Sequence, residues 1–186
     1  MRVELIDYRD NWQAVKDAAM NTVGKDSGKY PTSEWKRQIL LAEHSPIRLL
    51  EFTFVIHDLP YWVSVHLVRH NIGITHFVST QRTDRTGIDR TSLPQDALVT
   101  HRIHLNAQAL INISRKRLCN QASPETRKAW QAVIDCMKEY EPELASVCVR
   151  ECVYRGFCPE LRSCGYQECE QFGKLWVRYV INPKER

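Results

Sequence analysis

The hydrophobic pattern predicts two helices in the first quarter of the chain. The first is marked by apolar residues at helical spacing, namely Trp12, Val15, Ala18 and Ala19. The second runs through EWKRQILLAEH, residues 34–44, with Thr32 or Ser33 as its N-cap. The following HSP triplet predicts its end, because the residue before a proline avoids the helical region.

The clearest strand follows directly. Within LLEFTFVIHDLP, residues 49–60, apolar and polar positions alternate with a period of two until Leu59-Pro60 ends the run. The next segment, YWVSVHLVRH, fits either a strand or a helix; a helix would place its cations on one face, namely His66, Arg69 and His70. Residues 71–100 are rich in Thr, Asp, Gly and Arg, which predicts a loop.

Two further helices are predicted in the second half. NAQALINISRKRLCNQ spans residues 106–121, and SPETRKAWQAVIDCMKEYEPEL spans residues 123–144. In the latter, Ser123 fits the N-cap, Pro124 the first helical position and Glu125 the first turn. No repeat or flexible linker interrupts the pattern. We therefore expect one α+β domain over residues 1–186, with a cysteine-rich segment at about 146–170.

Composition narrows the class of protein. The chain has 186 residues, of which 43% are hydrophobic and 26% charged, as in ordinary globular domains. No apolar run approaches the roughly 20 residues of a membrane span, and MRVELIDYRDNW lacks the apolar stretch of a signal peptide. We expect a cytoplasmic protein without a membrane partner. The net charge of +4 suits phosphorylated small molecules better than nucleic acid.

Four arginines are candidate phosphate ligands, since guanidinium forks match phosphate oxygens: Arg69, Arg82, Arg90 and Arg117. On a helix starting at Asn106, eleven residues subtend about 1100°, so Asn106 and Arg117 point the same way. Gln108 and Asn112, four apart, form a second polar ridge. A solvated SRKR face and a capping Asn106 explain the same pattern, and periodicity alone does not choose between these interpretations.

Metal binding is the weaker interpretation of the histidines and cysteines. The pair His66 and His70 has a metal-like spacing, but no HExxH acid and no third ligand accompany it, so no metal is expected there. Seven cysteines without a secretory signal favour reduced thiols. The tail cysteines lack tight CxxC pairs, so buried thiols are favoured while a structural zinc site stays open for Cys148, Cys152, Cys158 and Cys164. Helical spacing predicts that Cys119 and Cys136 are core residues.

Several ordered motifs between about residues 40 and 130 resemble the flavin-dependent thymidylate synthase family. EHSPIRLLEFTFVIHDLPYWVSVHLVRH and NIGITHFVSTQR contain Arg69-His70-Asn71, seven residues and then Ser79. This run is similar to the family signature of Arg-His-Arg, seven residues and Ser. DRTSLPQD resembles the family's Arg-x-x-Leu-Pro element, and NAQALINISRKRLCNQASPETR resembles its Asn-Ala-Arg-x-Leu-x-Asn helix.

The resemblance implies an antiparallel sheet flanked by helices and a homotetramer with active sites between subunits. It also implies FAD-dependent reductive methylation of dUMP to dTMP, with methylenetetrahydrofolate and NADPH as co-substrates. Arg117 and Ser79 would be catalytic. The substrate-binding residues would be His66, Ser79, Thr80, Arg82, Arg90 and Arg117. Those lining FAD would be Ser45, Arg69, His70, Asn71, Asn106, Gln108 and Asn112.

The chain departs from the family pattern at several of these positions. Asn71 and Gln108 replace flavin-contacting arginines, Arg48 stands where glutamate is common, and His66 replaces a nucleotide-contacting glutamine. Two other interpretations therefore remain: a flavin enzyme acting on another pyrimidine nucleotide, and a non-catalytic nucleotide- or RNA-binding module.

Overall fold

A four-stranded antiparallel sheet, ordered β1-β2-β4-β3, organises the computed structural model, which describes residues 1–180. The alternating run builds the central strand β2 (Glu51–Pro60), whose Phe52, Phe54 and Ile56 are fully buried. Its partners β1 (Arg2–Tyr8) and β4 (Leu98–Asn106) flank it, and β3 (Ile74–Val78) forms the edge beside β4. The α+β class and the antiparallel sheet are thus confirmed.

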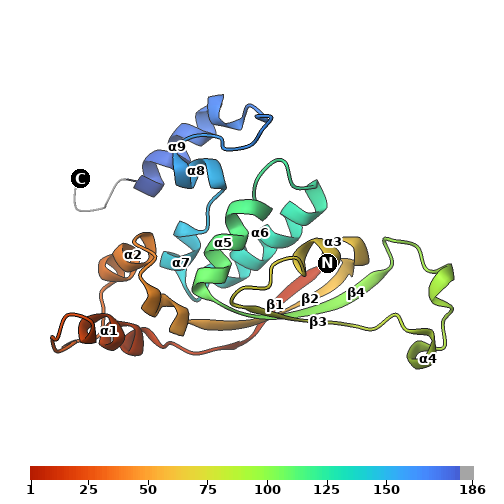
Figure 1. The fold of residues 1–186 in the computed structure, drawn as a ribbon, viewed down its shortest axis with the longest axis horizontal. Coiled ribbons are helices and arrows are strands. Elements are labelled where there is room, and N and C mark those ends of the chain that lie inside the picture. Colours follow the sequence, from red (N-terminus) through yellow and green to blue (C-terminus); the bar gives the residue numbers. More distant parts are fainter. Residues whose placement is uncertain (181–186) are drawn as a thin grey trace.

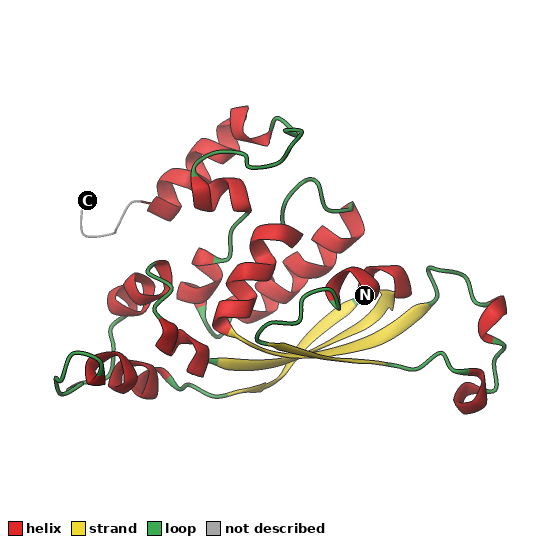
Figure 2. Cartoon of the chain, viewed as in Figure 1, coloured by secondary structure: helices red, strands yellow, loops and turns green. Residues whose placement is uncertain are grey.

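Helices cover only one face of this sheet (Figure 1, Figure 2). On that face lie α3 (Tyr61–Leu67), α5 (Ala107–Arg117) and α6 (Pro124–Lys138). The pair α1 (Trp12–Asn21) and α2 (Ser33–Leu41) lies at one end of the sheet, and the short α4 (Thr83–Thr86) lies beyond the other. The chain finishes in α7 (Pro142–Val147), α8 (Glu151–Arg155) and α9 (Glu170–Val180). Among these described elements, no helix has the length and apolar character of a membrane span.

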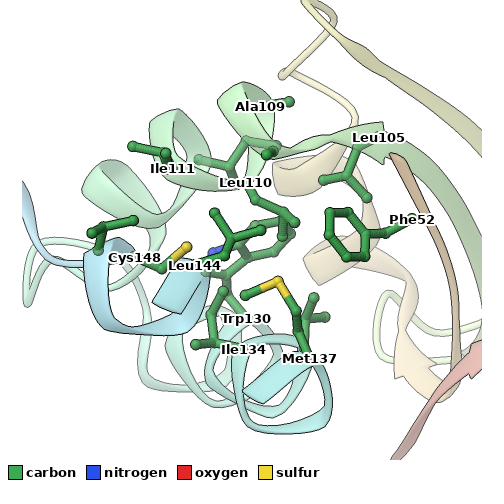
Figure 3. Packing of buried hydrophobic residues seen from close by; sticks show 14 of the residues in the cluster. Phe52, Leu105, Ala109, Leu110, Ile111, Trp130, Ile134, Met137, Leu144 and Cys148 are labelled. Atoms are coloured by element: carbon green, nitrogen blue, oxygen red, sulfur yellow. The ribbon is translucent and has the colours of Figure 1, made fainter. Parts of the chain in front are cut away.

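The core lies between the sheet and α5 and α6, where Phe52 and Leu110 pack around Trp130 (Figure 3). The indole of Trp130 is buried with its polar atom satisfied, because Nε1 donates to Ser114 Oγ at 2.9 Å. Ser114 in turn donates to the carbonyl of Leu110 at 2.7 Å. This chain of hydrogen bonds lets a large aromatic residue fill the core without an unpaired N–H.

The capping residues expected from the sequence are confirmed. Thr32, Asn106 and Ser123 accept hydrogen bonds from the first turns of α2, α5 and α6, respectively. Two helices end earlier than expected: α2 stops at Leu41, and α6 stops at Lys138 before a separate α7. In α2 the break comes before the proline, because Glu43 adopts a left-handed backbone with φ of 49°.

The prediction of a loop over residues 71–100 is wrong at both ends. Residues 74–78 form β3, and β4 begins at Leu98. Both strands place a histidine on the core side, His76 opposite Ile103 and His101 opposite Ile56. In each strand, a histidine therefore occupies a position where the alternating pattern would have an apolar residue. The ambiguous segment from residue 61 is helical only as far as Leu67, so His70 lies in the turn after α3.

That turn fits tightly against the start of α5 and generates a first prediction. Gly73 has φ of +71°, and a Cβ there would lie 2.9 Å from Asn106 Nδ2, whereas Gly28, with φ of +63°, has open space. Both alanine variants carry left-handed strain of about 1–2 kcal/mol. Gly73→Ala additionally displaces the N-cap, so we expect it to cost about 1 kcal/mol more than Gly28→Ala in urea unfolding. Equal losses would show that the Gly73–Asn106 contact contributes nothing.

Candidate functional site

The guanidinium of Arg117 joins the end of α5 to the turn that follows α3. Its Nε donates to His70 Nε2 at 2.7 Å, and its Nη2 donates to the carbonyl oxygen of His66 at 2.7 Å. Burial, with a smaller contribution from nearby Arg69, lowers the pKa of Arg117, although a guanidinium remains charged at neutral pH. Within residues 1–180, Nη1 makes no hydrogen bond, so one edge of the cation is available to a ligand.

A chain of histidines holds His70 from behind. His76 Nε2 donates to the carbonyl of His70 at 2.7 Å, and His76 Nδ1 lies 3.0 Å from His101 Nε2. Because the carbonyl can only accept, His76 carries its proton on Nε2 and accepts at Nδ1 from His101. His70 likewise must accept from Arg117, which fixes its proton on Nδ1. The tautomer of each ring therefore follows from its neighbour.

His70 and His101 are neutral at pH 7. The pKa of His70 is lowered to about 4 by burial, then by Arg117 and His76. The pKa of His101, which is fully buried, is also lowered to about 4, by burial and then by His76. A cationic His70 would lose its acceptor and would face Arg117 as a like charge. Neutrality is therefore required for the Arg117–His70 hydrogen bond.

His66 is oriented separately by the start of α6. Its Nδ1 lies 3.2 Å from Thr126 Oγ1, and Ser123 Oγ donates to that same Thr126 oxygen at 2.9 Å. Since Thr126 Oγ1 already accepts from Ser123, its own proton is free to donate to His66 Nδ1. Burial, Arg117 and Arg69 lower the pKa of His66, which leaves a neutral ring with its N–H on Nε2.

The start of α5 forms a second polar cluster. Gln108 Nε2 donates to Glu43 Oε2 at 2.6 Å and to Asn112 Oδ1 at 3.3 Å, so the ridge expected from their spacing exists. Arg115 forms an ion pair with Glu43 and lies over the ring of Tyr154 at 3.5 Å. The negative charge of Glu43 is thereby compensated by the guanidinium of Arg115. Anionic groups approaching Asn112 would meet amides rather than a free negative charge.

Asn106 lies apart from the Arg117–His70 pair. It caps α5 by accepting from Ala109 N at 3.0 Å, and its side chain packs against Gly73. It also lines an open pocket of ≈ 270 Å³ with His104 and Thr75, on the edge of the face that the described helices leave uncovered. Arg117 instead points to His70. The helical geometry that aligned Asn106 with Arg117 does not bring their side chains into one cluster.

The remaining candidate substrate ligands lie on an extension between β3 and β4, which projects away from the helices (Figure 1). Ser79 begins it, accepting at Oγ from Thr100 N at 3.0 Å, and Thr80 Oγ1 accepts from Arg82 N at 3.2 Å. The Arg82 guanidinium is exposed and paired with Asp84 at 2.8 Å. Arg90 is also exposed, and its hydrogen bonds in the described chain involve only its backbone N–H and carbonyl.

Within one chain, the candidate ligands thus fall into three groups. His66, Arg69, His70 and Arg117 gather around the end of α3, as their contacts and mutual charge effects show. Gln108 and Asn112 lie on the first half of α5, whereas Ser45 and Asn71 are exposed on separate turns. The third group is Ser79, Thr80, Arg82 and Arg90 on the extension.

Sequence reasoning missed four residues that organise these groups, namely His76, His101, Glu43 and Arg115. The two histidines left a signal in the sequence, because each sits at an apolar position of an alternating pattern, in ITHFV and VTHRI. Glu43 and Arg115 left none, since their pairing depends on the break after α2.

The fold is shared with flavin-dependent thymidylate synthases. No protein-family model matches the chain, and no curated protein sequence matches it. Among solved structures, the flavin-dependent thymidylate synthase ThyX of Helicobacter pylori, complexed with FAD and dUMP, superposes with a TM-score of 0.64 at 15% identity. The match covers 81% of this chain and 100% of that one.

A second structure of the same kind widens the comparison. The UMP/dUMP methylase PolB of Streptomyces cacaoi, bound with 5-Br dUMP, matches with a TM-score of 0.62 at 16% identity, covering 83% of this chain and 94% of that one. At these identities the likeness establishes the fold. The resemblance noted in the sequence motifs is confirmed at that level.

The neutral histidines generate a second prediction. Both His70 and His101 should titrate near pH 4 rather than at the usual 6.5, as measured from the ring proton shifts by NMR. Since the folded pKa lies below the unfolded one, stability should be full above about pH 6.5 and fall as the pH drops towards 4. Titration of both rings at the pKa of an exposed histidine would contradict the hydrogen-bonded chain.

Proposed function

We propose that this chain is a flavin-dependent enzyme that methylates a uracil nucleotide: FAD-dependent reductive methylation of dUMP to dTMP, with methylenetetrahydrofolate and NADPH. One observation carries the proposal. Arg117 and His70 form a hydrogen-bonded pair at positions that the family motifs assign to nucleotide and flavin, within a fold shared with a flavin-dependent thymidylate synthase complexed with FAD and dUMP. The pair would connect the two ligand sites that such a reaction needs.

Arg117 would hold the anionic part of the nucleotide. Its Nε and Nη2 are occupied by protein acceptors, which lock the guanidinium plane and leave Nη1 for the substrate. The adjacent His70 and His66 are neutral, so neither ring carries a hydrated charge that would have to be desolvated when a phosphate binds. A cation fixed in this way orients a ligand without reorganising when it arrives.

FAD fits the donor set on the other side of the Arg117–His70 pair. Arg69 is an exposed guanidinium next to His70, and Asn71 and Asn112 are exposed amides that can donate to phosphate oxygens. The nearby carboxylate of Glu43 is neutralised by Arg115, which removes a repulsion that a diphosphate would otherwise meet. When bound, FAD would supply hydride chemistry, and the protein groups would supply binding and orientation.

The orientation of His66 favours uracil over cytosine. Because Thr126 donates to Nδ1, the ring presents an N–H at Nε2, and this nitrogen has no partner within residues 1–180. Placed at position 4 of the base, an N–H donor would pair with the carbonyl oxygen of uracil, whereas it would meet the amino group of cytosine as a second donor. This contact supports dUMP or UMP as substrate, which are the nucleotides named for one structural relative.

The complete site would require more than one subunit. Arg82 and Arg90 lie on the projecting extension, whereas Arg117 lies among the helices. We propose a homotetramer in which the extension of one subunit delivers its arginines to the Arg117–His70 pair of another. The exposed apolar residues of the extension, including Ile88 at 53% exposure, support this arrangement because they would gain cover at such a contact.

The central test of function combines spectroscopy with turnover. We expect purified protein to show the visible absorption of a flavin, or to acquire it on reconstitution with FAD. With NADPH and methylenetetrahydrofolate it should convert dUMP to dTMP, and dCMP should react at least about tenfold more slowly because an unsatisfied donor pair costs 1–3 kcal/mol. Turnover of UMP, which differs from dUMP by its 2′-hydroxyl group, shows which sugar the enzyme prefers. Protein that binds no FAD under any of these conditions rules the proposal out.

Sharing of the site between subunits is tested by mixing two impaired variants. Arg117→Lys keeps the charge but loses the fork that contacts His70 and His66, and Arg82→Ala removes a cation from the extension. Each alone should lose about 10- to 100-fold in kcat/KM, since charged contacts contribute about 1.5–3 kcal/mol. Coexpressed together, they should regain activity, because some sites then receive wild-type Arg117 and wild-type Arg82.

Arg85→Ala is the matched control, because Arg85 is exposed on α4 and its side chain has no partner in the described chain. It should remain active. Failure of the coexpressed pair to regain activity, while each variant stays folded and assembled, would place both arginines in the same subunit's site.

A further inference from the structure

Four cysteines from separate parts of the sequence line one small cavity. Cys119 follows the end of α5, Cys152 lies on α8, and Cys158 and Cys164 lie on the loop between α8 and α9. The cavity has a volume of ≈ 10 Å³, which is the room of a single water-sized body. The other three cysteines, Cys136, Cys148 and Cys169, lie outside it. In particular, Cys148 is buried and hydrogen-bonded with Ser114, so Cys119 takes the place expected for it.

The surroundings of these thiols suit thiolates that share a cation. All four are free cysteines. The backbone N–H of Gln121 donates to the sulfur of Cys119. A divalent soft metal ion would remove the protons and convert mutual repulsion into shared attraction.

We propose that Cys119, Cys152, Cys158 and Cys164 bind one Zn²⁺ ion as a tetrahedral set of thiolates. Four sulfurs from three elements are the set that structural zinc prefers, and they need not occur as tight CxxC pairs. Each thiol releases its proton to solvent, so four thiolates and the ion carry a net charge of −2. Arg150 lines the same cavity and stacks on Tyr166 at 4.0 Å, which places a cation against that charge.

Binding requires a small closure of the loop. Among residues 1–180, no three histidine, cysteine or carboxylate side chains are already gathered so as to hold an ion. The loop that carries Cys158 and Cys164 is bounded by Gly156 and Gly165, with φ of 77° and 75°, and it has few buried side chains. Moving its two sulfurs inward would shift a loop that is held by hydrogen bonds from Gln121 to the carbonyl of Arg162 and from the backbone N–H of Cys158 to Gln167. The ion would then link the end of α5 to α8 and the loop before α9.

The test is a zinc titration of the full chain after metal removal with a chelator. Wild type should bind about one Zn²⁺ per chain, in competition with a chromogenic chelator. Cys164→Ser should bind at least about tenfold more weakly, since removing a ligand costs more affinity than altering a residue that only hydrogen-bonds to a ligand. Cys164 is exposed, so this variant should fold. Cys136→Ser, which alters a thiol on α6 outside the cavity, is the matched control and should bind as wild type does.

Thiol reactivity gives a second measurement that does not depend on any variant. Zinc should protect Cys119, Cys152, Cys158 and Cys164 from alkylation, as read by mass spectrometry, and a chelator should remove the protection. Equal zinc affinity of Cys164→Ser and wild type would overturn the proposal. So would disulfides among the four cysteines in protein purified without oxygen, or identical alkylation with and without zinc. None of these results depends on flavin or nucleotide binding.

Discussion

The half-buried guanidinium of Arg117 is the interaction on which the candidate site depends. It is the contact that ties the end of α5 to both His66 and His70, and so fixes the turn between α3 and β3. Hydrogen bonds from a charged donor in partly buried surroundings contribute about 1.5–3 kcal/mol each. They do so only while His70 is neutral, because a protonated ring offers no acceptor. Burial keeps His70 neutral, and a neutral His70 can accept the hydrogen bond that holds the Arg117 guanidinium in place.

The elements that could be predicted from the sequence are those in which apolar residues occupy the core positions of the repeating pattern. Strand β2, helix α5 and helix α6 follow from alternation or helical spacing together with capping residues such as Asn106 and Ser123. Strands β3 and β4 were missed because His76 and His101 occupy core positions, and a histidine reads as polar in any hydrophobic pattern. The two rings share a hydrogen bond between β3 and β4, which no local pattern reveals.

The same limit applies to the site. Arg117 and its neighbourhood could be proposed from motifs, but the tautomer chain through His76 depends on the register of β3 against β4. The cysteine cavity shows this more sharply. Spacing within the tail suggested Cys148 as a member of the cysteine cluster. In the structure, Cys119, from the segment between α5 and α6, lines the cavity instead. Helical spacing had placed Cys119 in the core, and it instead follows α5 and is only partly buried. Contacts between distant segments are decided by packing rather than by sequence distance.

The extension between β3 and β4 is a further consequence of the fold. None of residues 79–97 is buried, although the segment contains apolar side chains and several cations. A long segment with no core of its own is usually functional, because ordering it costs conformational entropy that its own contacts do not return. Here its short helices are held by local bonds such as Arg82–Asp84 and by the capping of residues 90–92 by Asp89. These bonds preserve a shape without satisfying the guanidinium of Arg90.

Charges beside α5 and α8 are paired, whereas two cations at the proposed ligand positions near the end of α3 are not. Glu43 and Arg115 cancel each other beside α5, and Glu151 is balanced by Lys116 and Arg155 beside α8. The neutral histidines add nothing at pH 7. Near the end of α3, Arg117 keeps a free edge and Arg69 is exposed without an ion pair in the described chain. A modest overall charge can therefore produce a strong local attraction for phosphate, because neighbouring charges are paired and the remaining ones are fixed in place.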